Sequence, residues 1–234
     1  MPTNRKIAIV VAMERELAPL IKLWQRVERS HSGREFRFFE NGTAVLVAGG
    51  IGAEAARRAT EAVISLYGPD LVISAGFAGA LDNTLAVGDV ITPAWVINAR
   101  DGGRVETDRG AGVLVTVATT ASVEQKAKLA KAYHAQAVDM EAAAVALGAQ
   151  ARGIRFAALK SISDAAGFEL PPMDRFVTHD GKFRTVPFVI FTALRPQLWS
   201  TVIGLARNSG VASRALCGAL ERFLGEETAS NERT

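Results

Sequence analysis

The sequence predicts an α/β fold in which helices cover both faces of a central mixed, mostly parallel sheet. Short apolar runs typical of buried strands recur along the chain, helix-prone segments separate them, and glycine-rich turns join the two. Of the 234 residues, 49% are hydrophobic and 22% are charged, which is typical of a soluble globular protein. We expect a single domain over residues 1–234, with a core at about 5–225 and a disordered tail at 226–234.

The first third of the chain supplies strands and two helices. Apolar runs predict strands at residues 6–12, 34–39, 43–48 and 71–75. Helix-prone sequence covers residues 14–24 and 53–67. Asn41-Gly42 is typical of two-residue turns, so the two strands beside it should form a hairpin. Gly68-Pro69 should end the second helix.

The rest of the chain continues the alternation. Strands are predicted at residues 89–92, 94–97, 113–118, 137–140 and 155–161. Helices are predicted at residues 123–133, 141–152, 198–207 and 211–224. The polar, glycine-rich segment 101–112 and the sequence after residue 161, which contains Pro171 and Pro172, predict loops.

Composition excludes several classes of function. The net charge is +3, but the basic residues are scattered among acids, so we expect no nucleic-acid partner. Cys217 is the sole cysteine, and His31, His134 and His179 share no ligand spacing, so no metal site is predicted. No apolar stretch approaches the roughly 18 residues of a transmembrane segment. We expect a cytoplasmic protein.

A glycine turn at residues 49–52 superficially resembles a dinucleotide-binding turn. Gly50-x-Gly52-x-x-Ala55 follows a strand and opens a helix. The acidic residue that should hold the ribose lies at the end of the next strand in such proteins, whereas Asp70 lies at its start. We therefore predict no nicotinamide or other cofactor. The turn can still bind an anion or a ribose edge.

Three acidic residues are each predicted at a strand-to-helix junction, namely Glu16, Glu141 and Asp164. Ligands of open α/β sheets bind beyond the carboxyl ends of the strands, so these side chains are candidates for one crevice. The alternative for each residue is a helix-start acid that complements the helix dipole.

Cleavage of an N-glycosidic bond would use such a set of acids. The bond breaks through an oxocarbenium-like sugar while negative charge builds up on the leaving base, which an acid must neutralise. The reaction also needs a carboxylate near the sugar and a group that holds the attacking nucleophile. Asp164 lies in the apolar segment 161–166, where burial should raise its pKa and keep a proton on it.

Five ordered motifs resemble those of the purine nucleoside phosphorylase/nucleosidase superfamily. They are residues 12–16 (AMERE), 49–52 (GGIG), 74–81 with 85–90, 138–142 (VDMEA) and 161–164 (SISD). They look most like the 5′-methylthioadenosine/S-adenosylhomocysteine nucleosidases. The resemblance implies a three-layer, nucleoside phosphorylase-like fold, no metal and a homo-oligomer.

The resemblance also implies roles for individual residues. Glu16 would activate the attacking water, and Asp164, supported by Ser163, would donate a proton to the imidazole ring of the leaving purine. Glu141 would bind the ribose hydroxyls, with Met140 against the sugar. The other implied pocket residues are Ile51 and the Gly76–Gly79 backbone, including Phe77, Ala78 and Gly79. An aspartate at position 164 implies adenine as the base.

Departures from the family pattern leave alternatives open. Phosphorolytic relatives hold phosphate with an arginine and a serine near the Gly76–Gly79 turn, where this chain has Phe77 and Ser74. The lost charge-assisted contact favours hydrolysis, although Arg15 is a conceivable substitute and phosphate stays a possible second substrate. A catalytically silent nucleoside-binding protein is a further alternative.

The C-terminal region is similar to another branch, the hopanoid-associated phosphorylases. The resemblance lies in residues 156–164, 170–172, 180–181, 194–198 and 205–207. It implies an adenosine that carries a large lipid at its 5′ position, for which apolar C-terminal residues such as Trp199 could line a groove. Core packing and an oligomer interface are the alternative interpretations of these residues.

Overall fold

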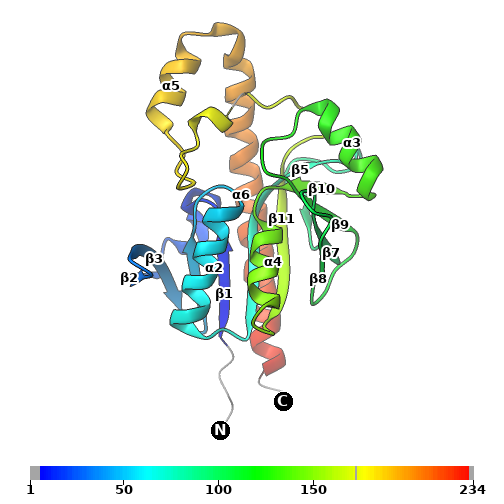
Figure 1. Ribbon diagram of the computed structural model, residues 1–234. Helices are drawn as coiled ribbons and strands as arrows, with labels where there is room; N and C mark the ends of the chain where they lie inside the picture. The colour runs from blue at the N-terminus through cyan, green and yellow to red at the C-terminus, as the bar shows by residue number, and fades with distance from the viewer. Residues whose placement is uncertain (1–5, 172, 232–234) are drawn as a thin grey trace.

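The computed structural model describes residues 6–171 and 173–231, and its centre is an eleven-stranded mixed sheet (Figure 1). The strand order is β2-β3-β4-β1-β5-β10-β9-β7-β8, and β11 pairs with both β5 and β6. The strands are β1 (Ile7–Val11), β2 (Gln25–His31), β3 (Arg34–Asn41), β4 (Ala44–Ala48), β5 (Leu71–Ala80), β6 (Val90–Ile91), β7 (Trp95–Asn98), β8 (Arg104–Glu106), β9 (Val113–Thr116), β10 (Ala137–Asp139) and β11 (Arg155–Asp164).

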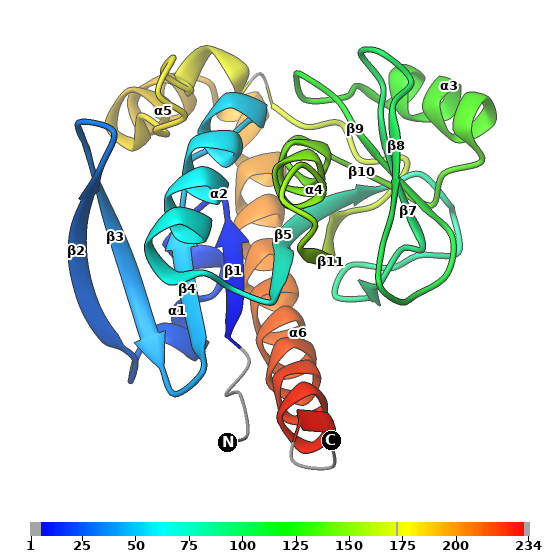
Figure 2. The ribbon, with the colours of Figure 1, turned by 60° about the horizontal axis from the view of Figure 1, so that its bottom comes forward.

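Helices flank this sheet. They are α1 (Ala18–Ile21), α2 (Ala53–Tyr67), α3 (Val123–Tyr133), α4 (Ala142–Gln150), α5 (Thr185–Ala193) and α6 (Trp199–Asn231), with short 3₁₀ turns η1 (Glu14–Glu16), η2 (Asp174–Phe176) and η3 (Pro196–Leu198). One apolar cluster joins α2 and α4 to one face of the sheet, and a second joins α1 and α6 to the other (Figure 2). This confirms the predicted three-layer α/β fold.

The centre of the sheet is parallel, as predicted. Strands β1, β4, β5 and β11 run parallel to one another, and all five residues of β1 are buried, as expected for an apolar run covered on both faces. Strand β11 follows β5 from the Arg155–Leu71 pair to the Asp164–Gly79 pair, with an irregularity between Ile162 and Asp164. This register places Asp164 beside the glycine-rich end of β5.

The N-terminal region differs from the prediction in its helix. Residues 14–24 form only η1 and the four-residue α1, and the chain then enters β2, which no sequence pattern predicted. Strand β2 pairs along its whole length with β3, so tertiary pairing decided the structure there. Likewise β8 lies within the predicted loop 101–112 because it pairs with β7. The hairpin of β3 and β4 around Asn41-Gly42 is confirmed.

The C-terminal region departs further from the prediction. Helix α5 lies in the predicted loop, and its Val- and Phe-rich sequence gave no helical signal. The two predicted closing helices are one helix, α6, because Gly210 does not interrupt an apolar face that includes Ala212, Leu216 and Leu220. Helix α6 also includes residues 226–231 of the predicted disordered tail, where Glu227 pairs with Arg155. Residues 232–234 of that tail lie outside the described part.

Candidate active site

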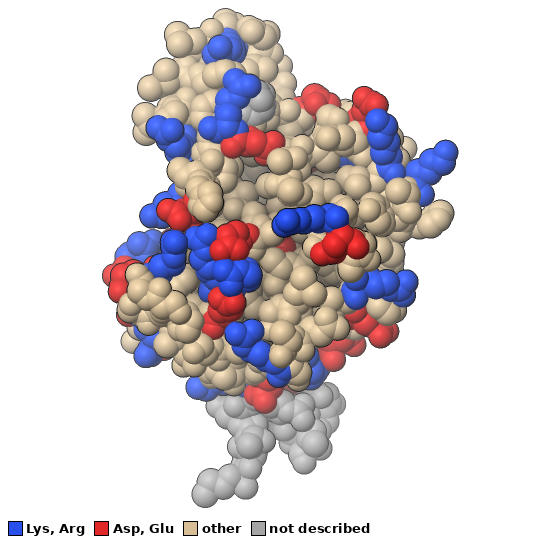
Figure 3. Space-filling view, viewed as in Figure 1, with Lys and Arg blue, Asp and Glu red and all other residues tan. Residues whose placement is uncertain are grey.

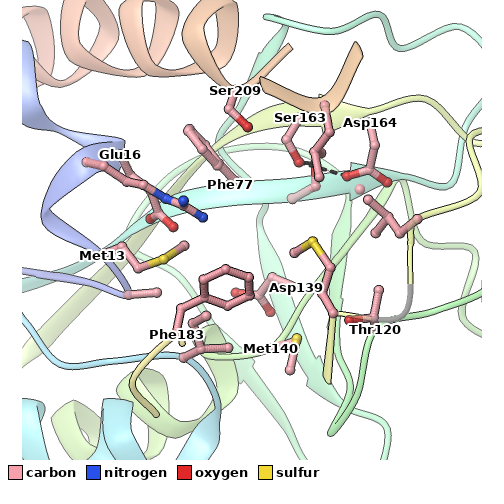
Figure 4. Close-up of a pocket in the computed structure, with 18 of the residues that line it drawn as sticks. Met13, Glu16, Phe77, Thr120, Asp139, Met140, Ser163, Asp164, Phe183 and Ser209 are labelled. Atoms are coloured by element: carbon pink, nitrogen blue, oxygen red, sulfur yellow. Dashed lines mark hydrogen bonds between the residues drawn. The ribbon is translucent and has the colours of Figure 1, made fainter. Parts of the chain in front are cut away.

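A cavity of about 690 Å³ lies at the carboxyl ends of the central strands. Nine of the residues that the sequence singled out line it: Glu16, Ile51, Phe77, Ala78, Gly79, Met140, Glu141, Ser163 and Asp164. Gly76 and Trp199 are not among the lining residues. Figure 4 shows Glu16 and Asp164 on opposite sides of this cavity, with Phe77 between them. The three acids therefore share one cleft although they are distant along the chain.

Glu16 reaches the cavity from η1, the turn that follows β1. Its side chain is buried, and its Oε2 atom has no hydrogen-bond partner within the described residues. Burial and the neighbouring Glu141 carboxylate raise the pKa of Glu16 to about 8, against the opposing effect of Lys160 and Arg15. An unpartnered carboxyl with such a pKa can exchange a proton with a bound molecule near neutral pH.

Glu141 occupies the N-cap position of α4, but its side chain does not cap that helix. Its Oε1 instead accepts a hydrogen bond of 2.8 Å from the Gly52 amide in the glycine turn. Burial and the nearby Asp139 raise its pKa to about 7. Glu141 is thus held by a remote segment and faces the cavity, which does not support the helix-start interpretation.

Lys160 and Asp139 form a buried ion pair beneath these acids, with Nζ 2.8 Å from Oδ2. Burial opposes the charge of Lys160, but Asp139, Glu141 and Glu16 outweigh it and raise the pKa of Lys160. The Thr116 hydroxyl also donates to Asp139 Oδ1 at 2.6 Å. Sequence reasoning missed this pair. A lysine in the middle of the apolar strand β11 was the available signal.

Asp164 is the last residue of β11, and residues 165–171 and 173 form no helix before η2, so the predicted strand-to-helix junction at Asp164 is wrong. Strand pairing with β5 extends further than the apolar run suggested, and this carries Asp164 into the sheet. The Ser163 hydroxyl donates to Asp164 Oδ1 at 2.7 Å.

Lys126 is the second partner of Asp164 and was missed by sequence reasoning. Its Nζ donates to Asp164 Oδ2 at 2.5 Å and to the Ala165 carbonyl at 3.0 Å, and its side chain is buried. The apolar setting expected for Asp164 therefore contains a cation. Lys126 lies on α3, whose polar sequence gave no sign that this lysine points inward.

Two glycines of β5 leave the space that the acids occupy. A Cβ atom on Gly76 would lie 2.9 Å from Glu16 Oε2, and the φ of Gly76 is +146°. A Cβ atom on Gly79 would lie 2.8 Å from Asp164 Oδ2 and 3.3 Å from Lys126 Cε. Residues with a side chain at these positions would displace the carboxylates.

Apolar side chains complete the walls. Phe77 comes from β5, Met140 precedes α4, and Ile51 is fixed by a hydrogen bond of 2.8 Å from its amide to the Gly181 carbonyl. Phe183 was not predicted, yet it lines the cavity, and Figure 4 shows it near Met13 and Met140. The segment before α5 thus supplies an aromatic ring to the site.

The family model of the phosphorylase superfamily matches residues 6–119 and 108–186, and so includes every residue of the site described above. The chain belongs to the phosphorylase superfamily. Among members of the superfamily, it is similar to the 5′-methylthioadenosine/S-adenosylhomocysteine nucleosidase of Shewanella putrefaciens, with 38% identity over 94 residues. That match covers 39% of this chain and only 41% of the relative.

Two further superfamily proteins match over longer stretches. The nucleosidase of the same name from Staphylococcus aureus is 29% identical over 201 residues, which are 70% of this chain and 88% of the relative. The structure of the 5′-methylthioadenosine nucleosidase of Arabidopsis thaliana in its apo form superposes with a TM-score of 0.73 at 20% identity. The superposition covers 94% of the present chain and 95% of the Arabidopsis chain, which shows that the two proteins share a fold.

Proposed function

We propose that this protein hydrolyses the N-glycosidic bond of a purine nucleoside, with adenine as the base and a substituent at the 5′ position. The observation that carries the proposal is the single cavity with carboxyl groups at one side and the Lys126–Asp164 pair at the other. A glycosidic bond held between them would have its sugar at the carboxyl groups and its base at the ion pair.

The Lys126–Asp164 pair would serve the leaving base. As the bond breaks, its electron pair goes to the base, and a proton delivered to the imidazole ring neutralises the resulting charge. That proton would pass from the Lys126 ammonium to the Asp164 carboxylate and from there to the ring nitrogen, which leaves Asp164 ionised and Lys126 as a neutral amine. Ser163 fixes the carboxyl group through its hydrogen bond to Oδ1.

Glu141 and Met140 would bind the sugar. A carboxylate accepts hydrogen bonds from two neighbouring hydroxyls, and the amide of Gly52 already fixes one oxygen of Glu141. Its negative charge also stabilises the positive charge that develops on the ribose in the transition state.

Glu16 would accept a proton from the attacking water. The oxygen of that water forms the new bond to the anomeric carbon, and its proton passes to the unpartnered Oε2 of Glu16. The products are free adenine and the 5′-substituted ribose. Glu16 then releases its proton to solvent and Lys126 takes one up from solvent, so that atoms and charges balance over the cycle without a cofactor.

The test is release of free base from purified protein with a panel of nucleosides, followed with and without phosphate. Asp164→Asn and Glu16→Gln should each abolish base release while the fold, checked by circular dichroism, stays intact. Full turnover by either variant would refute the assigned roles. Tight binding of adenosine analogues without base release by the wild type would instead support a silent binding protein.

A specific observation favours a large apolar 5′ substituent over a small one. Beyond the catalytic groups, the cavity continues between Phe188 and Val189 of α5 and Val202 and Leu205 of α6. These walls suit the lipid-substituted adenosine implied by the hopanoid-associated resemblance. The test compares kcat/KM for methylthioadenosine with kcat/KM for an adenosine that carries a long 5′-alkyl chain. A higher value for the long-chain substrate would support the large substituent, and a higher value for methylthioadenosine would support the small one.

Phosphorolysis is the second candidate reaction, because Arg15 and Arg214 both line the cavity and could hold an anion. Strict dependence on phosphate, with a ribose 1-phosphate derivative as product, would establish it over hydrolysis. Arg15→Gln would then raise the KM for phosphate, whereas it should leave a hydrolytic rate within a few-fold of the wild type.

A further inference from the structure

Helix α5 and the first turns of α6 form a lobe that projects beyond the carboxyl edge of the sheet (Figure 1). We refer to residues 174–205 as the α5–α6 lobe. Four phenylalanine rings hold it together: Phe176 packs on Phe188 and Phe191 at centroid distances of 5.3 and 5.2 Å, and Phe183 on Phe188 at 5.3 Å. The lobe thus has its own internal packing.

The outer surface of the lobe is apolar. Five large hydrophobic side chains there are between 50% and 75% exposed and do not line the cavity: Val186, Ile190, Leu194, Trp199 and Ile203. Soluble proteins seldom expose so many large apolar groups together unless the surface binds something. The inner phenylalanines account for the folding of the lobe, so these outer residues need another explanation.

The charges of the lobe indicate the kind of partner. Within residues 174–205 the sequence has four basic residues, Arg175, Lys182, Arg184 and Arg195, and two acidic ones, Asp174 and Asp180. Figure 3 shows the lobe as a mostly tan surface with several blue groups on the viewed face and red at its base. Both acids are engaged by residues outside the lobe, since Asp180 pairs with Arg34 and Asp174 accepts a hydrogen bond from Thr120.

Hydropathy agrees with the charge pattern. No single helix of the described residues is long and apolar enough to cross a membrane, but α5 and the segment Pro196–Ala229 pass that test together as a pair bent by 112°. Beyond the lobe, α6 packs against β11 through buried residues such as Leu216 and Leu220, so only the lobe end of this pair is free to meet a membrane. An exposed apolar and basic surface of that kind suits the boundary between lipid headgroups and acyl chains. Trp199 is half-exposed with its indole N–H bonded to the Thr192 carbonyl, which suits an interfacial tryptophan.

We propose that the α5–α6 lobe docks the protein on an anionic lipid bilayer, with Val186, Ile190 and Ile203 inserted among the lipids and Lys182 and Arg184 at the headgroups. The cavity is lined by the inner side of the same lobe, through Phe188 and Val202. Docking therefore places the mouth of the active site at the membrane surface. That consequence for the substrate rests on the proposed function, whereas the docking itself does not.

The test is co-sedimentation of the full chain with vesicles of phosphatidylcholine alone or mixed with phosphatidylglycerol. The wild type should bind the mixed vesicles at least tenfold more than the neutral ones, and salt should weaken the binding. The triple variant Val186→Ser/Ile190→Ser/Ile203→Ser should lose at least nine tenths of it. None of these three residues lines the cavity, so release of base from a small soluble nucleoside should persist.

Matched controls separate the lobe from general surface effects. Leu23→Ser changes a side chain that is 93% exposed outside the lobe and should leave vesicle binding unchanged. Lys182→Gln/Arg184→Gln should reduce binding several-fold, whereas Lys128→Gln/Lys131→Gln on α3 should not. Equal loss in both charge variants would overturn the proposal.

The remaining outcome concerns a second copy of this chain. If the wild type fails to bind mixed vesicles and the triple variant lowers the mass measured by light scattering, the lobe is an interface between copies and the docking proposal is wrong. Because vesicle binding is measured without substrate, its failure is distinguishable from failure of the proposed hydrolysis.

Discussion

Lys126 Nζ lies 2.5 Å from Asp164 Oδ2, and both side chains are buried at the end of the cavity opposite Glu16. The pair joins helix α3 to the last residue of β11, two segments 38 positions apart in the chain. A buried carboxylate and a buried ammonium each depend on the other for charge compensation. Substitutions in the Lys126–Asp164 pair should therefore change both the stability and the activity of the protein, and the two effects can be measured separately.

Lys126→Met should lower the rate of base release by about 10²–10⁴-fold, because the proton that reaches the leaving base would lose its source. It should also destabilise the fold by about 3–5 kcal/mol, since the Asp164 carboxylate would be left without its partner. Urea unfolding and single-turnover kinetics measure the two effects.

The double variant Lys126→Met/Asp164→Asn serves as its control. Removing both charges should restore most of the lost stability, whereas activity should stay as low as in either single variant. If Lys126→Met were destabilised yet fully active when folded, Lys126 would be a structural residue only.

Local sequence signals explain which parts of this arrangement could be predicted. Helix α3 was predicted with its observed bounds, and Ser122 and Gln125 form a reciprocal capping box at its start. Helix α2 follows Gly52 and ends at Gly68, which adopts a left-handed conformation. Glu16 and Glu141 were found because each follows a strand whose end is visible in the apolar pattern, whereas Asp164 was found although its strand continues to Asp164 itself.

The missed features depend on remote contacts. Lys126 and Lys160 are expected at the surface on sequence alone, and they are buried only because Asp164 and Asp139 arrive from other segments. Strand β2 forms because β3 lies beside it, not because of its own alternation. Helix α5 is rich in β-branched and aromatic residues, whose helix propensity is low, so packing on η2 and α6 decides its structure.

Activity should increase with pH up to about 8. Burial and Glu141 raise the pKa of Glu16 to about 8, and only the ionised carboxylate can accept the proton of the attacking water. The logarithm of kcat/KM should therefore rise with a slope near one between about pH 7 and pH 8 and then level off, and it should fall more steeply below about pH 7, where Glu141 also becomes protonated. A profile that is flat between about pH 6 and pH 9 would contradict the role of Glu16 as base.

Stability should have the opposite pH dependence. The pKa of Glu16 is about 8 in the folded protein and near 4.5 when the side chain is exposed, so the folded state binds more protons between these values. The unfolding free energy therefore falls as the pH rises through this window, by a few times the roughly 1.4 kcal/mol that one pKa unit represents. Below about pH 4.5 the contribution should be constant.

Glu16→Gln tests that linkage. The amide cannot ionise, so the unfolding free energy of the variant should fall much less than that of the wild type as the pH rises. The variant should therefore be more stable than the wild type at about pH 9, and the two proteins should be similarly stable at about pH 5. The residual slope should come from Glu141, whose pKa is raised to about 7 by burial and Asp139. Chemical denaturation at a series of pH values measures the difference, and parallel curves for the two proteins would be incompatible with a buried, titrating Glu16.

Gly79→Ala should impair catalysis without unfolding the protein. The added methyl group would lie 2.8 Å from Asp164 Oδ2 and 3.3 Å from Lys126 Cε, so the carboxyl group must move away from the base. A misplaced catalytic group costs up to about 10²-fold in rate, and we expect at least a tenfold loss in kcat with a smaller change in KM. Gly167→Ala is the matched control, because its Cβ would meet no atom within 4 Å. Equal activity of the two variants would mean that the position of Asp164 does not limit the reaction, and the acid would then have to be sought elsewhere in the cavity.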